Sequence, residues 1–269
     1  MYIPETDSTN NRLKVDVVAD AVWLRAETIP ALRTDYQTVG RGQTGNGWES
    51  ERGQNLLCSF VLRAPKVAVE SQFRLSILAA VALHQTVCDL APELQDALAI
   101  KWPNDLYYAD RKLAGILIEN SLMSGRIAYS VVGIGLNLNQ QVWSKGIPNP
   151  TSLCLLTERT YDAAQVFEQL IRRVETCLTI PQEAWKTYYM QHLYRREGLH
   201  PFVEREVSLQ PTMAAVNTET GVFMAAIQGI EENGGLVLQS EEGVRKTYHF
   251  KEIRYVLPAS DETKHIPTI

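Results

Sequence analysis

The stretch KWPNDLYYADRKLAGILIEN, Lys101 to Asn120, decides the fold, because it reads as the end of one strand followed by a β-hairpin. Trp102-Pro103 stops any helix, and Asn104-Asp105 is a turn pair. Leu106–Tyr108 and Lys112–Glu119 have the length and composition of two hairpin arms. The second arm contains LAGILI, which is apolar on both faces, so we expect it in the centre of a sheet.

Two residues of this stretch are candidate ligand contacts. Lys101 falls at the mouth of the sheet beside a rigid turn, where its ammonium could neutralise a carboxylate and then a phosphate. A lone lysine at a strand end is more often simply solvated. Gly115 lies inside an apolar strand, which indicates close approach of a ligand or of backbone, although packing alone would also explain it.

A second stretch, GRGQTGNGWES (residues 40–50), contains the dinucleotide-binding pattern G-x-G-x-x-G. That pattern must open a helix, but the residues after Gly45 are a poor helix start, and no HRD or DFG follows to indicate a kinase loop. We therefore expect a loop whose backbone N–H groups can surround an anion, with Arg41 as a fixed cation and Trp48 as apolar cover. An exposed connection without a ligand is the alternative.

The remaining chain has the pattern of an α+β protein. The expected helices are residues 10–18, 71–90, 162–178 and 182–194, and the expected strands are residues 31–36, 55–63, 98–102 and 127–134. After about Leu199 the short runs VEREVSL, GVFMAAIQGI, GLVLQS and RKTYHF alternate with turn signals. These runs predict a small all-β barrel of about sixty residues.

The composition excludes some classes of function. Lys and Arg total 26 against 31 Asp and Glu, a formal net charge of -5, which argues against sequence-independent binding to nucleic acid. The four cysteines are far apart without a CxxC pair, so buried reduced thiols in a cytoplasmic chain are expected. The first residues lack a signal peptide, and the longest mostly apolar stretch, Leu75–Leu83, is too short to span a membrane.

Both quoted stretches resemble signature segments of the biotin–protein ligases, the enzymes that biotinylate acetyl-CoA carboxylase and its relatives. Three further segments match in the same order along the chain. Asp7-Ser8-Thr9-Asn10 is similar to the family's DSTN start, and Gln37 stands three residues before the glycine loop. VVGIGLNLN, Val131 to Asn139, resembles the family's G-x-G-x-N strand end.

The resemblance implies a fold and a domain order. Residues 1–198 would form the catalytic biotin- and ATP-binding domain, a class II synthetase-like mixed sheet with flanking helices. Residues 199–269 would form an SH3-like β-barrel. Some relatives carry an N-terminal helix-turn-helix domain and repress transcription. Because the DSTN segment begins at residue 7, we expect a short form without this domain and without DNA as a partner.

The resemblance also implies a biotin site. Its residues would bind the ureido head or surround the carboxylate: Ser8, Thr9, Asn10, Gln37, Arg41, Gly42, Gln43, Lys101 and Gly115. Helix capping would equally account for the first three, and a polar strand edge for Gln37. Many relatives read GRGRRG, so Gln43 and Thr44 stand where those relatives have arginine. This difference raises the question of how tightly the loop retains the adenylate.

The same resemblance implies a nucleotide site and a reaction. The nucleotide-binding residues would be Arg41, Trp48, Gly133, Gly135 and Asn137, and the catalytic residues Lys101 and Arg41. A core tryptophan and a strand-ending turn are the alternative readings of Trp48 and of the last three nucleotide-binding residues. Biotin and ATP, which brings Mg2+, would give biotinyl-5′-AMP, and a lysine of a biotin carboxyl carrier protein would then accept the biotin. A homodimer is compatible with this enzyme. The alternatives are a lipoate–protein ligase and a non-catalytic sensor of biotin.

Overall fold

The computed structural model describes residues 1–19, 28–43, 46–63, 68–144, 147–205 and 219–257. The helices in this part are α1 (Thr9–Ala19), η2 (Val69–Ser71), α2 (Phe73–Leu90), η3 (Pro92–Ala97), α3 (Leu153–Thr157), α4 (Ala163–Thr179) and α5 (Gln182–Gln191). The strands are β1 (Tyr2–Thr6), β2 (Ala31–Gln37), β3 (Leu56–Arg63), β4 (Leu98–Lys101), β5 (Asp105–Tyr108), β6 (Arg111–Met123), β7 (Arg126–Leu136), β8 (His200–Arg205), β9 (Glu219–Ile230), β10 (Leu236–Ser240), β11 (Arg245–Tyr248) and β12 (Ile253–Tyr255).

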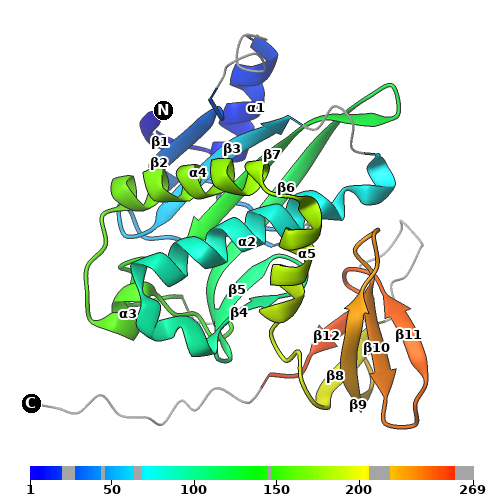
Figure 1. The fold of residues 1–269 in the computed structure, drawn as a ribbon. Helices are drawn as coiled ribbons and strands as arrows, with labels where there is room; N and C mark the ends of the chain where they lie inside the picture. The colour runs from blue at the N-terminus through cyan, green and yellow to red at the C-terminus, as the bar shows by residue number, and fades with distance from the viewer. Residues whose placement is uncertain (20–27, 44–45, 64–67, 145–146, 206–218, 258–269) are drawn as a thin grey trace, which may run out of the picture.

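The first sheet is mixed and has the strand order β1-β2-β3-β7-β6-β5-β4. Only β1 and β2 among its described neighbours pair in parallel, and every other pairing is antiparallel. The hairpin expected from the opening stretch is β5 and β6. Strand β6 lies between β5 and β7, so the central position predicted from LAGILI is confirmed. Figure 1 shows this sheet beside the smaller C-terminal sheet.

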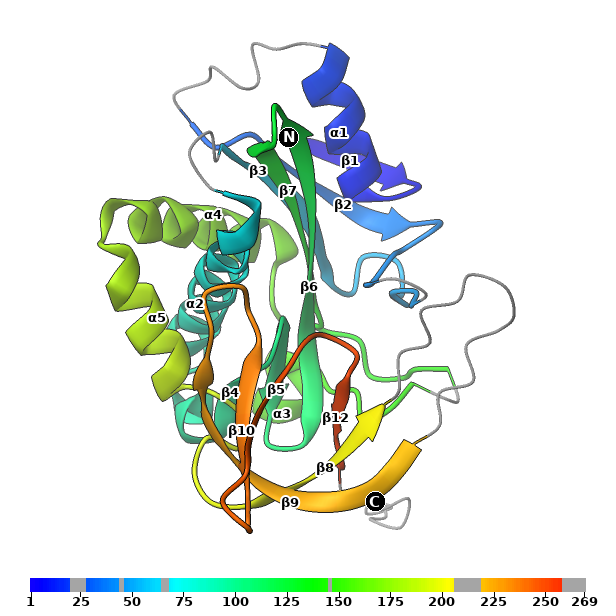
Figure 2. The same ribbon diagram turned by 90° about the vertical axis from the view of Figure 1, so that its right-hand side faces the viewer.

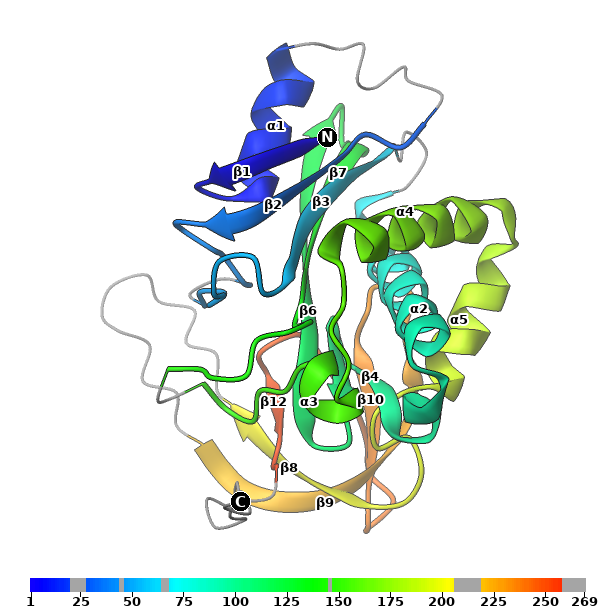
Figure 3. The ribbon, with the colours of Figure 1, turned by 90° about the vertical axis from the view of Figure 1, so that its left-hand side faces the viewer.

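Helices cover both faces of the first sheet, as Figures 2 and 3 show from opposite sides. Side chains alternate across a strand, and β3 divides accordingly: Cys58 and Phe60 belong to the main core with α2, α4 and α5, whereas Val61 packs with Leu13 of α1. The same alternation along β6 and β7 turns Gly115 and Gly133 toward the α1 face. This face carries the cavity described below.

The second sheet is antiparallel, with the strand order β11-β10-β9-β8-β12. Strand β9 bends strongly under the molecule in Figure 2. The second sheet shares its core with the first sheet and its helices, because Phe202 and Tyr255 belong to the same buried cluster as α2 and α5. The Trp102 indole also donates a hydrogen bond of 2.9 Å to the Gly234 carbonyl. The two sheets are therefore packed together rather than merely connected.

The expected elements are present, with some differences. Helix α5 ends at Gln191 instead of Tyr194, because the chain leaves the helix to pair with the edge strand: Ile100 donates to His192 O and accepts from Tyr194 N. Strands β1 and β12 and helix α3 were not expected from the sequence. The residues EVSL (206–209) of the run VEREVSL lie outside the described part.

Helix α2 is the central helix of the core. Within the described residues, Val69–Leu90 is long and apolar enough to cross a membrane by length and composition, and 67% of its apolar window is buried inside the protein. The segment Val69–Leu90 is therefore longer than Leu75–Leu83, the apolar stretch noted in the sequence. Its contacts with α4, α5 and the sheet are those of a core helix.

Candidate functional site

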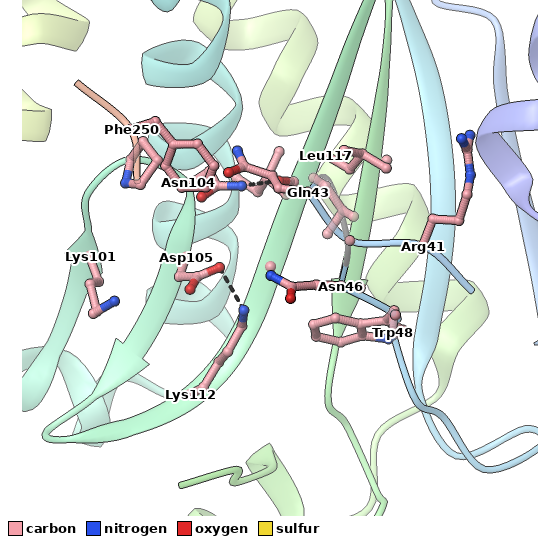
Figure 4. Close-up of a pocket in the computed structure, with 18 of the residues that line it drawn as sticks. Arg41, Gln43, Asn46, Trp48, Lys101, Asn104, Asp105, Lys112, Leu117 and Phe250 are labelled. Carbon is pink, nitrogen blue, oxygen red and sulfur yellow. Dashed lines mark hydrogen bonds and ion pairs between the residues drawn. The ribbon is translucent and has the colours of Figure 1, made fainter. Parts of the chain in front are cut away.

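A cavity of about 580 Å3 opens between the α1 face of the first sheet, the glycine loop and the edge of the second sheet. This volume suits a small organic ligand. Figure 4 shows Lys101 and Arg41 on opposite sides of it. The wall includes twelve of the thirteen residues proposed from sequence: Ser8, Thr9, Asn10, Gln37, Arg41, Gly42, Gln43, Trp48, Lys101, Gly115, Gly133 and Gly135.

Asn137 is the proposed residue that does not line the cavity. Its side chain is 3% exposed and donates a hydrogen bond of 2.9 Å to the Thr151 carbonyl. Its backbone N–H bonds Leu113 O, and its carbonyl accepts from Leu153 N. These contacts fasten the end of β7 to the following loop, so the geometry gives Asn137 a supporting place behind the site.

Three glycines keep the floor of the cavity free of side chains. A Cβ atom on Gly133 would lie 2.4 Å from Asn10 Oδ1, and one on Gly135 would lie 2.3 Å from the Trp48 ring. A Cβ on Gly115 would lie 3.0 Å from the same ring. Glycine is required at the first two positions because these neighbours rest directly on the strand backbone. At Gly115 the close neighbour seen in this structure is Trp48.

A buried polar cluster stands at the start of α1. Ser8, Thr9 and Asn10 are 3%, 4% and 2% exposed. Gln37 Oε1 accepts hydrogen bonds from Thr9 N at 2.8 Å and Thr9 Oγ1 at 3.1 Å. Ser59 Oγ lies 2.7 Å from Thr9 Oγ1 and 2.6 Å from Asn10 Oδ1. The helix end is thus capped from the neighbouring strand by Gln37, and the cluster is fixed in place by mutual hydrogen bonds.

The glycine loop is a small hairpin and not the start of a helix. Gly42 N donates to Asn46 O at 2.8 Å, and Trp48 N donates to Gly40 O at 3.0 Å. Arg41 and Gly47 form an isolated antiparallel bridge. The next described regular element is the strand β3, as the rejection of the dinucleotide pattern predicted. Thr44 lies outside the described residues.

Arg41 points away from Lys101 and toward α1 (Figure 4). Its Nη2 atom lies 2.6 Å from Asn11 Oδ1 and 3.0 Å from Glu119 Oε2. Glu119 also pairs with Lys14 Nζ at 2.6 Å. In this structure the cation expected to meet a ligand anion is therefore paired with a carboxylate of the protein.

Lys101 is partly buried at the end of β4, unlike a solvated strand-end lysine. Its Nζ atom lies 5.0 Å from the ring centre of Tyr107 and 4.9 Å from that of Tyr255. Burial lowers the pKa of Lys101, and the negative charge of Asp105 partly opposes this shift. Asp105 itself pairs with Lys112 Nζ at 2.8 Å. Among the described residues, the Lys101 ammonium has aromatic faces but no hydrogen-bond partner, so it is available to a ligand.

Several wall residues were not found from sequence. They include Asn46, Asn104, Asp105, Lys112, Arg205, Phe250, Lys251, Ile253, Arg254 and Tyr255. Asp105 and Lys112 lie on the two strands of the quoted hairpin and could have been included with Lys101. The sequence around the last six residues gives no signal that they belong to the site, because packing of the second sheet against the first brings them there.

The wall is strongly basic although the whole chain is acidic. Its described charged residues are six cations and one carboxylate: Arg41, Lys101, Lys112, Arg205, Lys251, Arg254 and Asp105. The chain as a whole has a formal net charge of -5. Cations concentrated in a cavity favour an anionic ligand, and more strongly there than on open surface. The site thus combines a polar pocket, a glycine floor and a group of cations.

Comparison with known proteins gives consistent matches. The model of the Biotin/lipoate A/B protein ligase family matches residues 23–137. The bifunctional ligase/repressor BirA of Salmonella typhimurium is 30% identical over 93% of this chain and 72% of its own length. BirA of Bacillus spizizenii is 32% identical over 80% of this chain, which spans 62% of that relative's length.

A solved structure agrees over nearly the whole chain. The biotin protein ligase from Aquifex aeolicus in complex with biotin and ATP superposes with a TM-score of 0.71. It is 25% identical in sequence, and the match covers 95% of this chain and 98% of that one. The match includes both sheets, which supports the fold expected from sequence.

Proposed function

Because this chain belongs to the biotin–protein ligase family, we propose that it activates biotin with ATP and transfers it to a carrier protein. The first step would give biotinyl-5′-AMP and pyrophosphate. The second would attach biotin to a lysine of a biotin carboxyl carrier protein and release AMP. The observation that carries the proposal is one cavity that joins the buried polar cluster of Ser8, Thr9 and Asn10 to Lys101.

In the proposed first step, the polar cluster holds the ureido head of biotin and Lys101 meets its carboxylate. Ser8, Thr9, Asn10 and Gln37 supply neutral donors and acceptors that are already oriented. The carboxylate oxygen attacks the α-phosphorus of ATP, and pyrophosphate leaves. Two anions approach each other in this step, so a preorganised cation is the main catalytic requirement. The partly buried Lys101 ammonium would supply this cation.

The nucleotide would lie over the glycine floor. In this structure Asn10 lies over Gly133 and the Trp48 ring lies over Gly135, so a planar base would take the place of the ring, which would then cover the base as an aromatic surface. Arg41, Gly42 and Gln43 would surround the phosphate when Arg41 leaves Glu119. Asn137 would support this floor from behind.

In the proposed second step, the ε-amine of the carrier lysine attacks the mixed anhydride. Bond formation to the biotin carbonyl carbon releases AMP, and a proton is lost from the amine. Water would hydrolyse the same anhydride, so the glycine loop would close over the intermediate. The resemblance and the paired state of Arg41 both support a loop that changes its contacts during the reaction.

Magnesium would arrive with ATP. Asp105 is the carboxylate on the described wall and already pairs with Lys112, so phosphate oxygens and water would supply most ligands of the ion. We further propose a cytoplasmic enzyme with residues 1–198 as the catalytic domain and 199–269 as the SH3-like domain. A homodimer would be compatible with β1, an edge strand of the described sheet.

The decisive experiment is mass spectrometry of a purified carrier domain incubated with this protein, biotin and ATP. A gain of one biotinyl group on a lysine is expected. Lipoate in place of biotin tests the lipoate–protein ligase alternative, and preferential attachment of lipoate would contradict the proposal. A protein that binds biotin without releasing pyrophosphate would be a sensor and not a ligase.

A further inference from the structure

Lys101 is held between two aromatic rings that come from different parts of the chain. Tyr107 lies on the strand paired with β4, so its contact with Lys101 is local. Tyr255 lies on β12 in the second sheet and places its ring centre 4.9 Å from the Lys101 Nζ atom. Aromatic faces carry partial negative charge and attract an ammonium, most strongly where water is scarce.

The surroundings of Tyr255 keep its ring in one place. The side chain is 4% exposed. Its ring centre lies 4.9 Å from that of Phe202 and 5.6 Å from that of Tyr194. Strand β12 is further fastened to the first domain, because Arg195 donates a hydrogen bond of 2.9 Å to the Val256 carbonyl. The ring is thus a rigid support on which a flexible lysine chain can rest.

The other groups that act on Lys101 do not fix its position. Asp105 attracts the ammonium but is paired with Lys112, and Lys112 and Arg195 repel it. Within the described residues no hydrogen bond or ion pair holds its Nζ atom. Burial raises the pKa of Tyr255, so its phenol stays neutral and presents an uncharged ring. The two rings are therefore what restrains the ammonium.

From this geometry we propose that Tyr255 is a positioning residue, through which the second sheet holds the Lys101 ammonium at the reacting carboxylate. The inference rests on the proposed function, because it concerns the lysine assigned to adenylation there. It makes the second sheet part of the machinery of the first step. In this proposal the second sheet contributes to adenylation and is more than a surface that binds other molecules.

The test compares Tyr255→Leu, which removes the ring, with Tyr255→Phe, which retains it. The matched control is Tyr248→Leu. Tyr248 lies in the second sheet, is also 4% exposed and has Lys246 Nζ 4.9 Å from its ring centre. Unlike Tyr255, it does not line the cavity. Pyrophosphate release is measured against pH and biotin concentration in the full chain. Transfer from synthetic biotinyl-AMP and the unfolding temperature are measured beside it.

For Tyr255→Leu we expect kcat of pyrophosphate release to fall roughly tenfold with little change in KM for biotin, since a misplaced cation costs rate. The alkaline limb of the pH profile should move down by roughly 0.5–1 pH unit, because the ammonium loses an aromatic partner. Tyr255→Phe should restore both values toward the parent, and transfer from biotinyl-AMP should change less. Tyr248→Leu should lower the unfolding temperature without moving the limb.

If Tyr255→Leu and Tyr248→Leu give the same rates and pH profiles, the proposed role of Tyr255 is wrong. If Tyr255→Leu does not fold, Tyr255→Met is tested instead, because the longer and more flexible methionine side chain adapts to the same space without a ring. The same downward shift of the alkaline limb is then expected. A parent protein that releases no pyrophosphate would overturn the proposed function itself, which is a different result from an active parent insensitive to loss of the ring.

Discussion

The polar cluster at the start of α1 and the glycine loop face the same cavity but are built differently. In the cluster, Thr9 and Asn10 are buried and bonded to Gln37 and Ser59. In the loop, Arg41 Nε, Gln43 Oε1 and Trp48 Nε1 are buried without a hydrogen-bond partner among the described residues. Buried polar atoms without partners are costly, so the loop gains from any ligand that supplies them. We therefore expect the cluster to be ready before binding and the loop to be completed by binding.

The comparison extends to the charged groups. Lys101 is on the rigid side, at the end of a strand and between two rings. Arg41 is on the loop side and is paired with Glu119 in this structure. A fixed cation can act on the first chemical step at once. A cation that must exchange partners suits retention of the product of that step.

The largest expected effect is that of Lys101→Gln on the rigid side. Pyrophosphate release should fall on the order of 10²–10³-fold, because one preorganised electrostatic group is lost. The unfolding temperature should change little, since the ammonium is not hydrogen-bonded within the described part and glutamine retains most of the stem. Synthetic biotinyl-AMP should restore part of the transfer activity. A variant that adenylates biotin at the parent rate would show that Lys101 is not at the catalytic centre.

Ser59→Ala tests whether the cluster is preorganised. Ser59 is fully buried, and its hydroxyl contacts Thr9 Oγ1 and Asn10 Oδ1. Its loss leaves buried polar atoms unsatisfied, so the free energy of unfolding should fall by about 1–3 kcal/mol. Urea unfolding measures this loss, and calorimetry should show weaker binding of biotin. Ser144→Ala is the control, because Ser144 is exposed in the loop after β7 and does not line the cavity. Equal stability of both variants would contradict preorganisation.

Gln43→Arg tests the loop directly. An arginine at this position would add a cation that pairs with the adenylate phosphate. A charged hydrogen bond is worth about 1.5–3 kcal/mol, so release of biotinyl-AMP should slow by roughly ten- to a hundredfold. A single-turnover release assay measures this rate, and the rate of pyrophosphate formation serves as the control. An unchanged rate of biotinyl-AMP release would show that residue 43 does not contact the adenylate phosphate.

The same loop can be probed by proteolysis without substitution. We expect cleavage between Gly40 and Gly53 in the free protein to be suppressed several-fold by biotin plus ATP, because ligand contacts would offset the entropy of the glycines. Cleavage at a site remote from the cavity provides the reference rate. Equal cleavage with and without ligands would contradict a loop completed by binding.

Glu119→Gln should give the smallest effect. It removes the charge that pairs with Arg41 and Lys14 but retains the shape, and a partly exposed pair contributes about 0.2–1 kcal/mol. Cleavage of the free loop should become faster, while cleavage of the ligand-bound loop should not. An equal increase in both states would contradict Glu119 as an anchor of the free loop alone.

The stabilisation that the ion pairs of Glu119 with Arg41 and Lys14 contribute should decrease as the pH falls. Burial raises the pKa of Glu119, but hydrogen bonds from Lys14 and Asn10 and the charge of Arg41 outweigh it, so the pKa lies below 4.5. A lowered carboxyl pKa adds stability that is present above the ordinary value and lost as pH falls through the lowered one. The difference between Glu119→Gln and the parent should therefore be constant from pH 5 to 8 and disappear at lower pH. Protease resistance measured with an acid-active protease checks this.

The sequence alone determined the parts of the molecule that depend on neighbours along the chain. Apolar runs and turn residues predicted the hairpin around Ala109, the central strand through Gly115 and the long helix ending at Leu90. Five motifs in order pointed to the family and to twelve residues of the cavity wall. Such patterns are readable because a strand or helix places its own residues at fixed intervals.

Only the tertiary structure decided what depends on residues far apart in the chain. It paired Arg41 with Glu119, moved Asn137 behind the wall and brought Tyr255 of the second sheet against Lys101. None of these contacts leaves a local pattern, because each joins residues from different elements that only the packing of the chain brings together. Packing of the two sheets around one core sets their relative position, and through it the environment of the lysine.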